Sequence, residues 1–262
     1  MSYMDHFNAA QVKDALVQWI RYIFEANGKG CNAVIGISGG KDSTVAAALC
    51  AEALGPDHVI GVMMPDGWQK DSDDAREVIE LTKICWTYVN IEKATSGILD
   101  RLDTLHTNVD SDLHDMKILP SEQTKRNLPP RIRMATLYAV AQSFHGRVIN
   151  TSNLSEAWVG WSTRWGDSVG DFAPLANLTT DEIVAIGREL GLPAHLIEKA
   201  PSDGLCGKTD EDALGFSYST LNEYIRTGVC DNADVKAKID ALHDKNYFKL
   251  CPMPEFPDYI ME

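Results

Sequence analysis

No stretch of this 262-residue chain approaches the roughly 18 consecutive apolar residues that a membrane-spanning helix needs. The N-terminal sequence MSYMDHFNAAQVKDALVQWI also lacks a basic segment followed by an apolar one, so it does not resemble a signal peptide. Its apolar residues instead have the spacing of an amphipathic helix, which we predict over about residues 5–27. These absences argue against a membrane partner.

Paired cysteines are missing as well. Six cysteines are scattered along the chain without a CxxC motif: Cys31, Cys50, Cys85, Cys206, Cys230 and Cys251. Scattered thiols without a secretion signal are typical of a reducing, cytoplasmic environment. We therefore expect a cytoplasmic protein whose cysteines are mostly buried and unreactive.

Basic residues are scarce. The chain has 24 Lys and Arg against 38 Asp and Glu, a formal net charge of −14. Such a charge argues against a nucleic-acid partner, because binding to the phosphate backbone normally requires a basic surface. It does not exclude small phosphate ligands, which main-chain amides and bound cations can hold.

The sequence does contain a regular alternation of strands and helices. The predicted strands are 32–37, 58–64, 87–91 and 147–151, and the helices among them are 42–49, 71–85 and 130–145. This alternation predicts an α/β fold with a doubly wound parallel sheet flanked by helices. In such sheets ligands bind beyond the carboxyl ends of the strands.

The remainder of the chain, about 179–262, is predicted to be a mainly helical C-terminal part. Helices are expected near 179–191, 218–227 and 232–244. Residues 104–124 have little pattern and are expected to form a loop. No change of composition marks a boundary, so we expect one domain over 1–262.

A glycine-rich turn follows the first strand and opens the first helix of the sheet. It consists of Gly36, Ile37, Ser38, Gly39, Gly40, Lys41, Asp42 and Ser43. Glycines allow the main chain to approach an anion, and the amides at a helix start can bind phosphate. The turn is not a Walker A motif, because Ile35 occupies the first glycine position and Asp42 replaces the Ser or Thr. A plain Gly-Gly turn capped by Asp42 or Ser43 is the structural alternative.

The SGGxDS pattern of this turn resembles the pyrophosphate loop of the ATP-pyrophosphatase superfamily, and it implies an adenine nucleotide alpha-hydrolase-like fold. Later segments resemble one family of that superfamily, the ammonia-dependent NAD synthetases. These are NLPPRIRM at 127–134, TSNLSE at 151–156, GWSTRWGD at 160–167, DFAPL at 171–175, APSDGL at 200–205 and TDE at 209–211. The similarity spans about residues 20–250.

The resemblance implies roles for individual residues. Asp42 and Glu156 correspond to Mg²⁺ ligands of the family, although Glu156 taken alone could be an ordinary helix-start carboxylate. Besides the loop 36–43, the positions on the ATP side are Gln69, Thr151 and Ser202, and Gln69 could equally be a solvated loop residue. Ser38, Asp42, Ser43 and Asp167 are the expected catalytic residues.

Another group of positions corresponds to the binding of deamido-NAD. These are Arg131, Arg164, Asp167, Asp171, Phe248 and Lys249. Guanidinium groups suit a dinucleotide pyrophosphate because they donate hydrogen bonds in pairs, although either arginine could serve in a structural salt bridge. Three positions depart from the family pattern: Arg164 and Thr180 each replace a Lys, and Phe248 replaces a His.

Some residues remain without an assigned role. His106 and His114 lack neighbouring ligands that would support a metal site. Trp158, Trp161 and Trp165 lie beside the substrate block; we expect them to pack in the core, with stacking on a substrate ring as the alternative.

The implied function is the ATP-dependent amidation of deamido-NAD to NAD by a ligase that forms an NAD-adenylate and releases AMP and pyrophosphate. Only about 30 residues precede the loop, which leaves no room for a glutamine-hydrolysing domain, so free ammonia is the expected nitrogen source. A homodimer is also implied. Two alternatives remain open: another ATP-pyrophosphatase ligase, and a non-catalytic adenine-nucleotide-binding protein.

Overall fold

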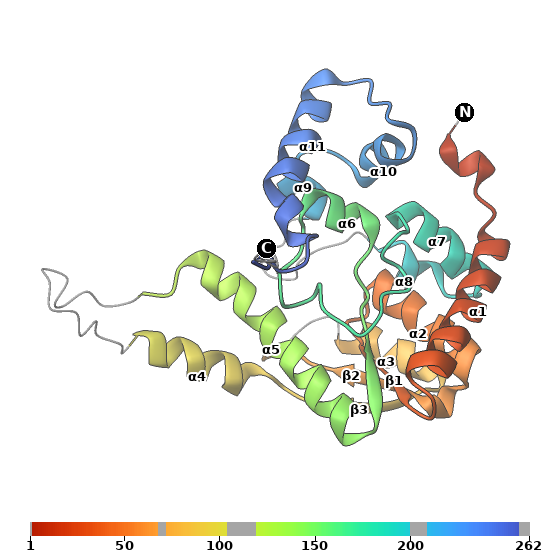
Figure 1. The fold of residues 1–262 in the computed structure, drawn as a ribbon, viewed down its shortest axis with the longest axis vertical. Coiled ribbons are helices and arrows are strands. Elements are labelled where there is room, and N and C mark those ends of the chain that lie inside the picture. Colours follow the sequence, from red (N-terminus) through yellow and green to blue (C-terminus); the bar gives the residue numbers. More distant parts are fainter. Residues whose placement is uncertain (1, 68–71, 104–118, 200–208, 257–262) are drawn as a thin grey trace, which may run out of the picture.

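The structure, a computed structural model, describes residues 2–67, 72–103, 119–199 and 209–256. In these parts of the chain the strands form a parallel sheet with the order β3-β2-β1-β4 (Figure 1). The strands are β1 Asn32–Gly36, β2 Val59–Met63, β3 Cys85–Tyr88 and β4 Gly146–Ile149. The prediction of a doubly wound parallel sheet is therefore confirmed.

Helices surround this sheet and make up most of the C-terminal part. They are η1 Tyr3–His6, α1 Ala9–Asn27, α2 Lys41–Leu54, η2 Pro56–His58, α3 Ser72–Thr82, α4 Glu92–Asp103, α5 Glu122–Ser143, α6 Leu154–Val159, α7 Thr180–Glu189, α8 Ala194–Ile197, α9 Asp210–Leu214, α10 Tyr218–Thr227, α11 Ala233–Asn246 and η3 Tyr247–Lys249. The three C-terminal helices predicted from the sequence correspond to α7, α10 and α11.

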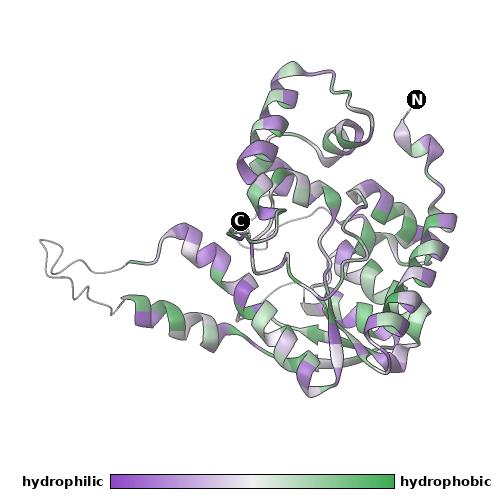
Figure 2. Cartoon of the chain, viewed as in Figure 1, coloured by the Kyte–Doolittle hydropathy of each residue, from purple (hydrophilic) through white to green (hydrophobic). Residues whose placement is uncertain are grey.

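Side chains alternate along each strand, so the apolar strands present apolar residues to both faces of the sheet, and helices cover both faces. In β1, Ala33 and Ile35 belong to the core shared with α1, α2 and α7, whereas Val34 faces the opposite core, under α5. Figure 2 shows apolar residues on the central strands and on the helix sides that face them. A third apolar cluster, around Leu221 and Ile239, joins the C-terminal helices.

Several element boundaries differ from the prediction. The N-terminal helix begins at Ala9 rather than near residue 5, because the side chain of Asn8 accepts a hydrogen bond from the Gln11 amide and caps it. α3 ends at Thr82 because Lys83 has a left-handed φ of 56°. The third strand consequently begins at Cys85 and ends at Tyr88, earlier than the predicted 87–91.

The predicted loop over 104–124 is wrong at its C-terminal end. Ser121 caps α5, which begins at Glu122, although the sequence placed the helix start near 130. α5 contains Pro129 and Pro130, which have no main-chain N–H to donate, and the carbonyls left without these donors lie on the exposed residues Lys125 and Arg126. α4, which was not predicted, projects beside α5 from the body of the molecule (Figure 1).

The expectation of mostly buried cysteines is only partly correct. Cys31 and Cys50 are buried, but Cys85 is exposed because it lies on the edge strand β3, and Cys230 and Cys251 are partly exposed. Cys206 lies outside the described residues, as do His106 and His114. None of the helices in the described ranges is long and apolar enough to cross a membrane.

Candidate active site

The candidate site lies where the direction of strand addition reverses. β2 and β3 extend the sheet on one side of β1, whereas β4 pairs with its other side. The chain leaving β1 enters the loop before α2, and the chain leaving β4 enters the segment before α6. Asp42 at the start of α2 and Glu156 at the start of α6 therefore belong to the two segments that flank this switch point, the usual ligand position in such folds.

The glycine-rich loop is shaped by its own hydroxyl groups. Gly39 has a φ of 81°, which favours glycine at this position. The Gly40 amide donates to Ser38 Oγ at 3.2 Å, and Ser43 Oγ donates to the Gly40 carbonyl at 3.0 Å. The hydroxyls of Ser38 and Ser43 lie 3.2 Å apart. The loop is therefore held in a turn by contacts among its own residues.

The start of α2 is suited to an anion. Its N-cap residue is Gly40, so no side-chain hydrogen bond caps the helix. The amides of the first turn have no partner within the helix and carry the positive end of its dipole. This arrangement supports the predicted phosphate-binding role of residues 38–43.

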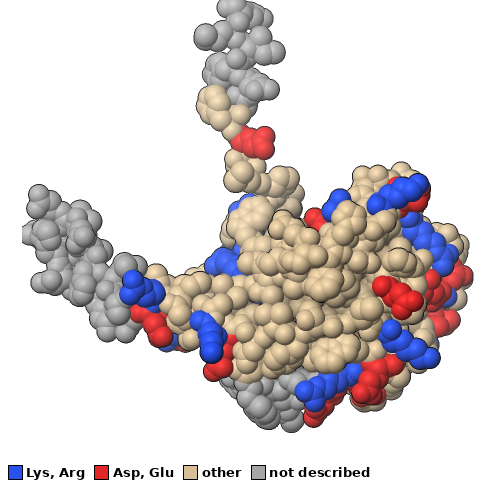
Figure 3. All heavy atoms as spheres, turned by 90° about the horizontal axis from the view of Figure 1, so that it is seen from below, with Lys and Arg blue, Asp and Glu red and all other residues tan. Residues whose placement is uncertain are grey.

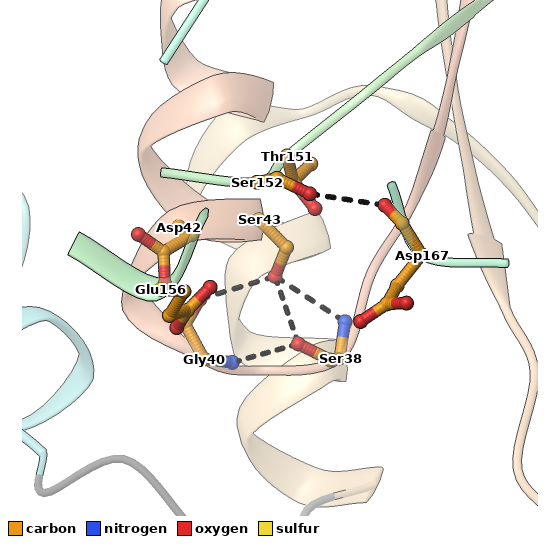
Figure 4. A pocket seen from close by; sticks show the side chains of 8 residues that line it. All are labelled: Ser38, Gly40, Asp42, Ser43, Thr151, Ser152, Glu156 and Asp167. Carbon is orange, nitrogen blue, oxygen red and sulfur yellow. Dashed lines mark hydrogen bonds between the residues drawn. The ribbon is translucent and has the colours of Figure 1, made fainter. Parts of the chain in front are cut away.

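A pocket of about 140 Å³ opens above the loop (Figure 4). It is lined by Ser38, Gly40, Asp42, Ser43, Thr151, Ser152, Glu156 and Asp167. Figure 4 shows Asp42 and Glu156 on one side and Asp167 on the other, with the loop between them. Whole-ligand pockets usually measure roughly 300–1,000 Å³, so the described walls enclose room for only part of a nucleotide, such as phosphate groups.

On the acidic side of this pocket, the carboxylates of Asp42 and Glu156 repel each other. Burial, and next the neighbouring Asp42, together raise the pKa of the Glu156 carboxyl from 4.5 to about 8, although Lys41 opposes the shift. The Lys41 side chain is itself buried, with its Nζ 3.3 Å from Asp42 Oδ2. Burial opposes the charge of Lys41, but Asp42, Glu156 and Asp210 outweigh it and raise the pKa of the amine.

The chemistry of this pair fits a divalent cation. Two half-buried carboxylates that repel each other are both favoured as anions when a cation lies between them. No group of three or more potential metal-binding side chains occurs among the described residues. A third protein ligand is not required for Mg²⁺, which commonly uses one or two carboxylates together with substrate phosphates and water.

Asp167 forms the opposite wall of the pocket. Its Oδ1 accepts a 2.6 Å hydrogen bond from the Thr163 amide, and Ser152 Oγ donates to its carbonyl at 3.0 Å. The surrounding protein raises the pKa of its carboxyl by displacing water, although the residue keeps contact with solvent in the pocket. Asp167 thus presents a carboxylate to the pocket from a rigid turn.

Arg164 lies close to two aromatic rings. Its guanidinium carbon lies 4.8 Å from the ring centre of Trp165 and 5.4 Å from that of Phe248. Its Nη2 donates to the Cys251 carbonyl at 3.3 Å, and its buried Nε has no hydrogen-bond partner among the described residues. The alternative that Arg164 forms a structural salt bridge receives no support here, because the contacts found are to rings and to a carbonyl.

The expectation that the tryptophans pack in the core is wrong for two of them. Trp161 is 36% exposed and Trp165 is 50% exposed, because both lie in the turn after α6. Trp158 is partly buried and stacks on His243 at 4.3 Å. The Trp165 ring contacts the guanidinium group of Arg164 instead of packing in the core.

Two other positions predicted on the substrate side make main-chain contacts. Arg131 donates from Nε and Nη2 to the Arg164 carbonyl at 3.4 Å. Asp171 lies beside the outer edge of β4, where its Oδ2 accepts the Val148 amide at 2.7 Å and its Oδ1 accepts the Tyr138 hydroxyl at 3.4 Å. The Asp171 carboxylate therefore extends the sheet edge in this structure.

The C-terminal helices fasten the turn that carries Arg164. Lys249 Nζ donates to the carbonyls of Gly160 and Ser162 at 2.7 and 2.9 Å. Gly160 has a φ of 68°, and a Cβ there would collide with the side chain of Asn246. The structure thus brings Phe248 and Lys249 to the turn that carries Arg164.

Some predicted positions do not contribute to the described pocket. Gln69 and Ser202 lie outside the described residues. Thr180 is buried, and its hydroxyl accepts a 2.8 Å hydrogen bond from Asn222 in a network with Ser155. A buried Thr in this network places no cation beside the pocket.

Sequence reasoning missed three residues at or near the site. Ser152 lines the pocket, and Asn153 contacts Asp42, yet both were passed over inside the TSNLSE segment. Arg133 of α5 donates to the Met64 carbonyl at 2.9 Å and lies in the electrostatic field of Asp66 and Asp167. Arg133 is part of the NLPPRIRM segment at 127–134, but the sequence assigned it no role.

Comparison with known proteins identifies the family. The family model described as NAD synthase matches residues 12–252. The chain belongs to the NAD synthase family. The match includes all the described segments that form the pocket. It confirms the resemblance inferred from the loop and the later blocks.

Individual relatives agree with this assignment. An NH(3)-dependent NAD(+) synthetase of Pyrococcus furiosus is 39% identical over 223 residues, which cover 85% of this chain and 79% of the relative. The structure of an NMN synthetase from Francisella tularensis is similar with a TM-score of 0.84 and 29% identity, covering 97% of this chain and all of that one. An NAD+ synthetase from Burkholderia pseudomallei gives a TM-score of 0.72 at 26% identity, with 93% and 90% coverage.

Proposed function

We propose that this member of the NAD synthase family converts deamido-NAD to NAD, using ATP and free ammonia and releasing AMP and pyrophosphate. One observation carries the proposal. A glycine-rich loop and two half-buried acids meet at the switch point of the sheet, in a chain of the NAD synthase family whose relative in Pyrococcus furiosus is named an NH(3)-dependent NAD(+) synthetase. A protein that only binds nucleotide has no need of both acids, so their presence favours a ligase.

In the first step a carboxylate oxygen of the acceptor attacks the α-phosphorus of ATP. A carboxylate–phosphorus bond forms, the bond from that phosphorus to the β-bridging oxygen breaks, and pyrophosphate leaves. The loop amides and the hydroxyls of Ser38 and Ser43 are suited to hold the departing phosphates, since they line a pocket of phosphate dimensions. No protein nucleophile is needed, because the substrate carboxylate is the nucleophile.

Mg²⁺ belongs to this proposal, with Asp42 and Glu156 as its protein ligands. When bound, the ion would neutralise the charge of the ATP phosphates. Lys41 adds a buried positive charge beneath Asp42. These residues favour phosphate binding despite the acidity of the whole chain.

In the second step ammonia attacks the activated carbonyl carbon, the bond to AMP breaks, and the nitrogen loses a proton. Asp167 is the candidate acceptor of that proton, because its carboxylate faces the loop across the pocket. Arg164 and Lys249 are candidates for holding the phosphates of the acceptor nucleotide. Gln69 and Ser202 remain proposed ATP contacts, as do Thr151 and the loop.

A second acceptor is favoured by one specific observation. The NMN synthetase structure covers this chain almost completely and has the higher TM-score of the two solved structures compared above. Nicotinate mononucleotide carries the same carboxylate as deamido-NAD and would be amidated by the same two steps. The two reactions differ only in whether an adenylate moiety extends beyond the site.

The test supplies Mg-ATP and ammonium with one acceptor at a time. With deamido-NAD we expect equal amounts of NAD, AMP and pyrophosphate, and no product when glutamine replaces ammonium. A larger kcat/KM with nicotinate mononucleotide would assign the second acceptor. AMP formed only with an unrelated acceptor would indicate a sister ligase, and nucleotide binding without AMP would indicate a binding protein.

We also propose a cytoplasmic homodimer. Figure 3 shows the underside of the molecule with a broad central area free of charged side chains, bordered by acidic and basic residues. Trp86 and Tyr88 of the edge strand β3 are exposed, and such apolar surface favours a second copy of the chain. Light scattering should give about twice the 28.9 kDa mass of the chain, and a monomer at assay concentration would refute this part.

A further inference from the structure

Asn153 lies between the two acids of the pocket and is completely buried. Its Nδ2 donates to Asp42 Oδ1 at 3.2 Å, and its Oδ1 accepts the Glu156 amide at 2.9 Å. The second of these bonds caps the N-terminus of α6, the helix that carries Glu156. One amide group thus touches both acid-bearing elements.

The orientation of this amide follows from its partners. The main-chain N–H of Glu156 can only donate, so the oxygen of Asn153 must face it. The NH₂ group is then directed at Asp42, whose carboxylate can only accept when ionised. Reversing the amide would place like groups together at both contacts.

The other oxygen of the same carboxylate is also held. Lys41 Nζ lies 3.3 Å from Asp42 Oδ2, and its side chain is only 6% exposed. Asp42 therefore has one oxygen bound by Asn153 and the other by Lys41. A carboxylate held at both oxygens by buried groups cannot turn freely about its last side-chain bond.

We infer that Asn153 is a positioning residue for the metal-binding pair, an inference that rests on the proposed function. Its amide sets the direction of the Asp42 carboxylate and, through the cap, the position of the first turn that bears Glu156. The two acids repel each other, so without the bridge Asp42 would rotate away from Glu156. The bridge keeps both ready for one cation. Loss of partners that orient a metal ligand typically costs about 10–100-fold in metal affinity.

The alternative role for Asn153 is a helix cap alone, and two substitutions distinguish the roles. In Asn153→Ser the hydroxyl can still cap α6 but is too short to reach Asp42 as well. Asn153→Ala removes both contacts. The matched control is Asn8→Ser, because Asn8 caps α1 in the same way, through the Gln11 amide, far from the pocket.

The experiment measures Mn²⁺ binding calorimetrically to the whole protein saturated with α,β-methylene ATP, which resists cleavage, alongside thermal unfolding and turnover. We expect Asn153→Ser and Asn153→Ala to weaken Mn²⁺ binding by a similar factor of about 10–100. Only Asn153→Ala should lower Tm beyond the shift of Asn8→Ser. In both Asn153 variants the Mg²⁺ concentration needed for half-maximal turnover should rise in parallel, whereas the KM for ammonium should change little.

A double substitution tests whether Asn153 acts through Asp42. In an Asp42→Ala background, Asn153→Ser should weaken Mn²⁺ binding no further, because the group it orients is gone. The inference would be overturned if Asn153→Ser bound Mn²⁺ as tightly as the wild type, so that only Asn153→Ala weakened binding. It would also be overturned if the effects of Asn153→Ser and Asp42→Ala on Mn²⁺ affinity were fully additive. Failure of the wild-type protein to bind Mn²⁺ with the ATP analogue would instead refute the proposed function.

Discussion

The guanidinium carbon of Arg164 lies 5.4 Å from the centre of the Phe248 ring. These two residues are 84 positions apart and are two of the places where the chain departs from its family's usual residues. Because the two side chains are in contact, we interpret the two replacements as linked. A planar guanidinium can stack on aromatic rings, whereas the ammonium of the usual Lys would gain less from a ring at position 248.

Arg164→Lys should retain turnover but bind the acceptor more weakly. The positive charge is kept, so kcat should change little, while loss of the planar contact with two rings should raise the acceptor KM by roughly 3–10-fold. Steady-state kinetics with varied acceptor and saturating ATP measure this split. Complete loss of activity would indicate a site rebuilt around the guanidinium, and an unchanged KM would show that the stack has no role in binding.

Asp42→Ala should abolish adenylation while leaving the fold intact. It removes one of the two proposed Mg²⁺ ligands at a helix start, and AMP formation should fall by on the order of 10²–10³. Thermal unfolding should stay cooperative but shift to a lower Tm, because the buried Lys41 and Asn153 lose their acceptor, a loss that relief of the repulsion with Glu156 offsets only in part. Near-normal turnover would refute the assignment of Asp42 as a metal ligand.

The parts of the site that could be predicted from the sequence are those encoded by local chemistry. The loop 36–43 carries its glycines, hydroxyls and acid on consecutive residues, and the structure keeps Ser38, Gly40, Asp42 and Ser43 together in one pocket. The resemblance also identified the later segments of the site, such as TSNLSE at 151–156. It could not predict how close these segments lie to the loop, because that depends on the pairing of β4 with β1.

Other features could not be predicted because tertiary structure overrides local rules. A helix was expected over 130–145, yet α5 begins at Glu122 and runs through Pro129 and Pro130. Asn153 looked like one polar residue among several, since nothing in TSNLSE reveals that Asp42 lies opposite. Trp165 was expected in the core, but its exposed ring instead contacts Arg164.

Arg226→Ala should destabilise the C-terminal helices strongly. Arg226 Nε and Nη2 donate to the two carboxylate oxygens of Glu182 at 2.8 and 2.6 Å, and the Glu182 side chain is only 4% exposed. Removing the arginine leaves a buried carboxylate that keeps its 2.8 Å hydrogen bond from the Thr179 amide but has lost its cation, at a cost of about 3–5 kcal/mol in the free energy of unfolding. Urea denaturation measures the loss.

A surface ion pair provides the control for this prediction. Arg188 contacts Glu198 at 2.8 Å, but both side chains are largely exposed. Arg188→Ala should cost only about 0–1 kcal/mol. Equal losses of stability from the two substitutions would contradict a stabilising role for the ion pair between Glu182 of α7 and Arg226 of α10.

Glu156→Gln should make the ligand-free protein more stable at alkaline pH. Burial and Asp42 raise the pKa of Glu156 from 4.5 to about 8. Because the folded state binds this proton more tightly than the unfolded state, the contribution of Glu156 to stability is fully present below pH 4.5 and is lost as the pH rises through about 8. A neutral Gln imitates the protonated acid at every pH and does not lose this contribution.

The measurement is the difference in free energy of unfolding between Glu156→Gln and wild type, from urea denaturation at pH 5 to 9. It should grow by up to about 1.4 kcal/mol per pH unit across the window and level off above pH 8, reaching on the order of a few kcal/mol. Replacing the exposed Glu80 by Gln should give no such trend. Added Mg²⁺ should stabilise the wild type and narrow the difference at pH 9, since the ion binds the ionised pair. Parallel pH profiles for Glu156→Gln and wild type would mean that Glu156 is ionised without strain, and the pocket would then lack the repulsion that makes it a site for a cation.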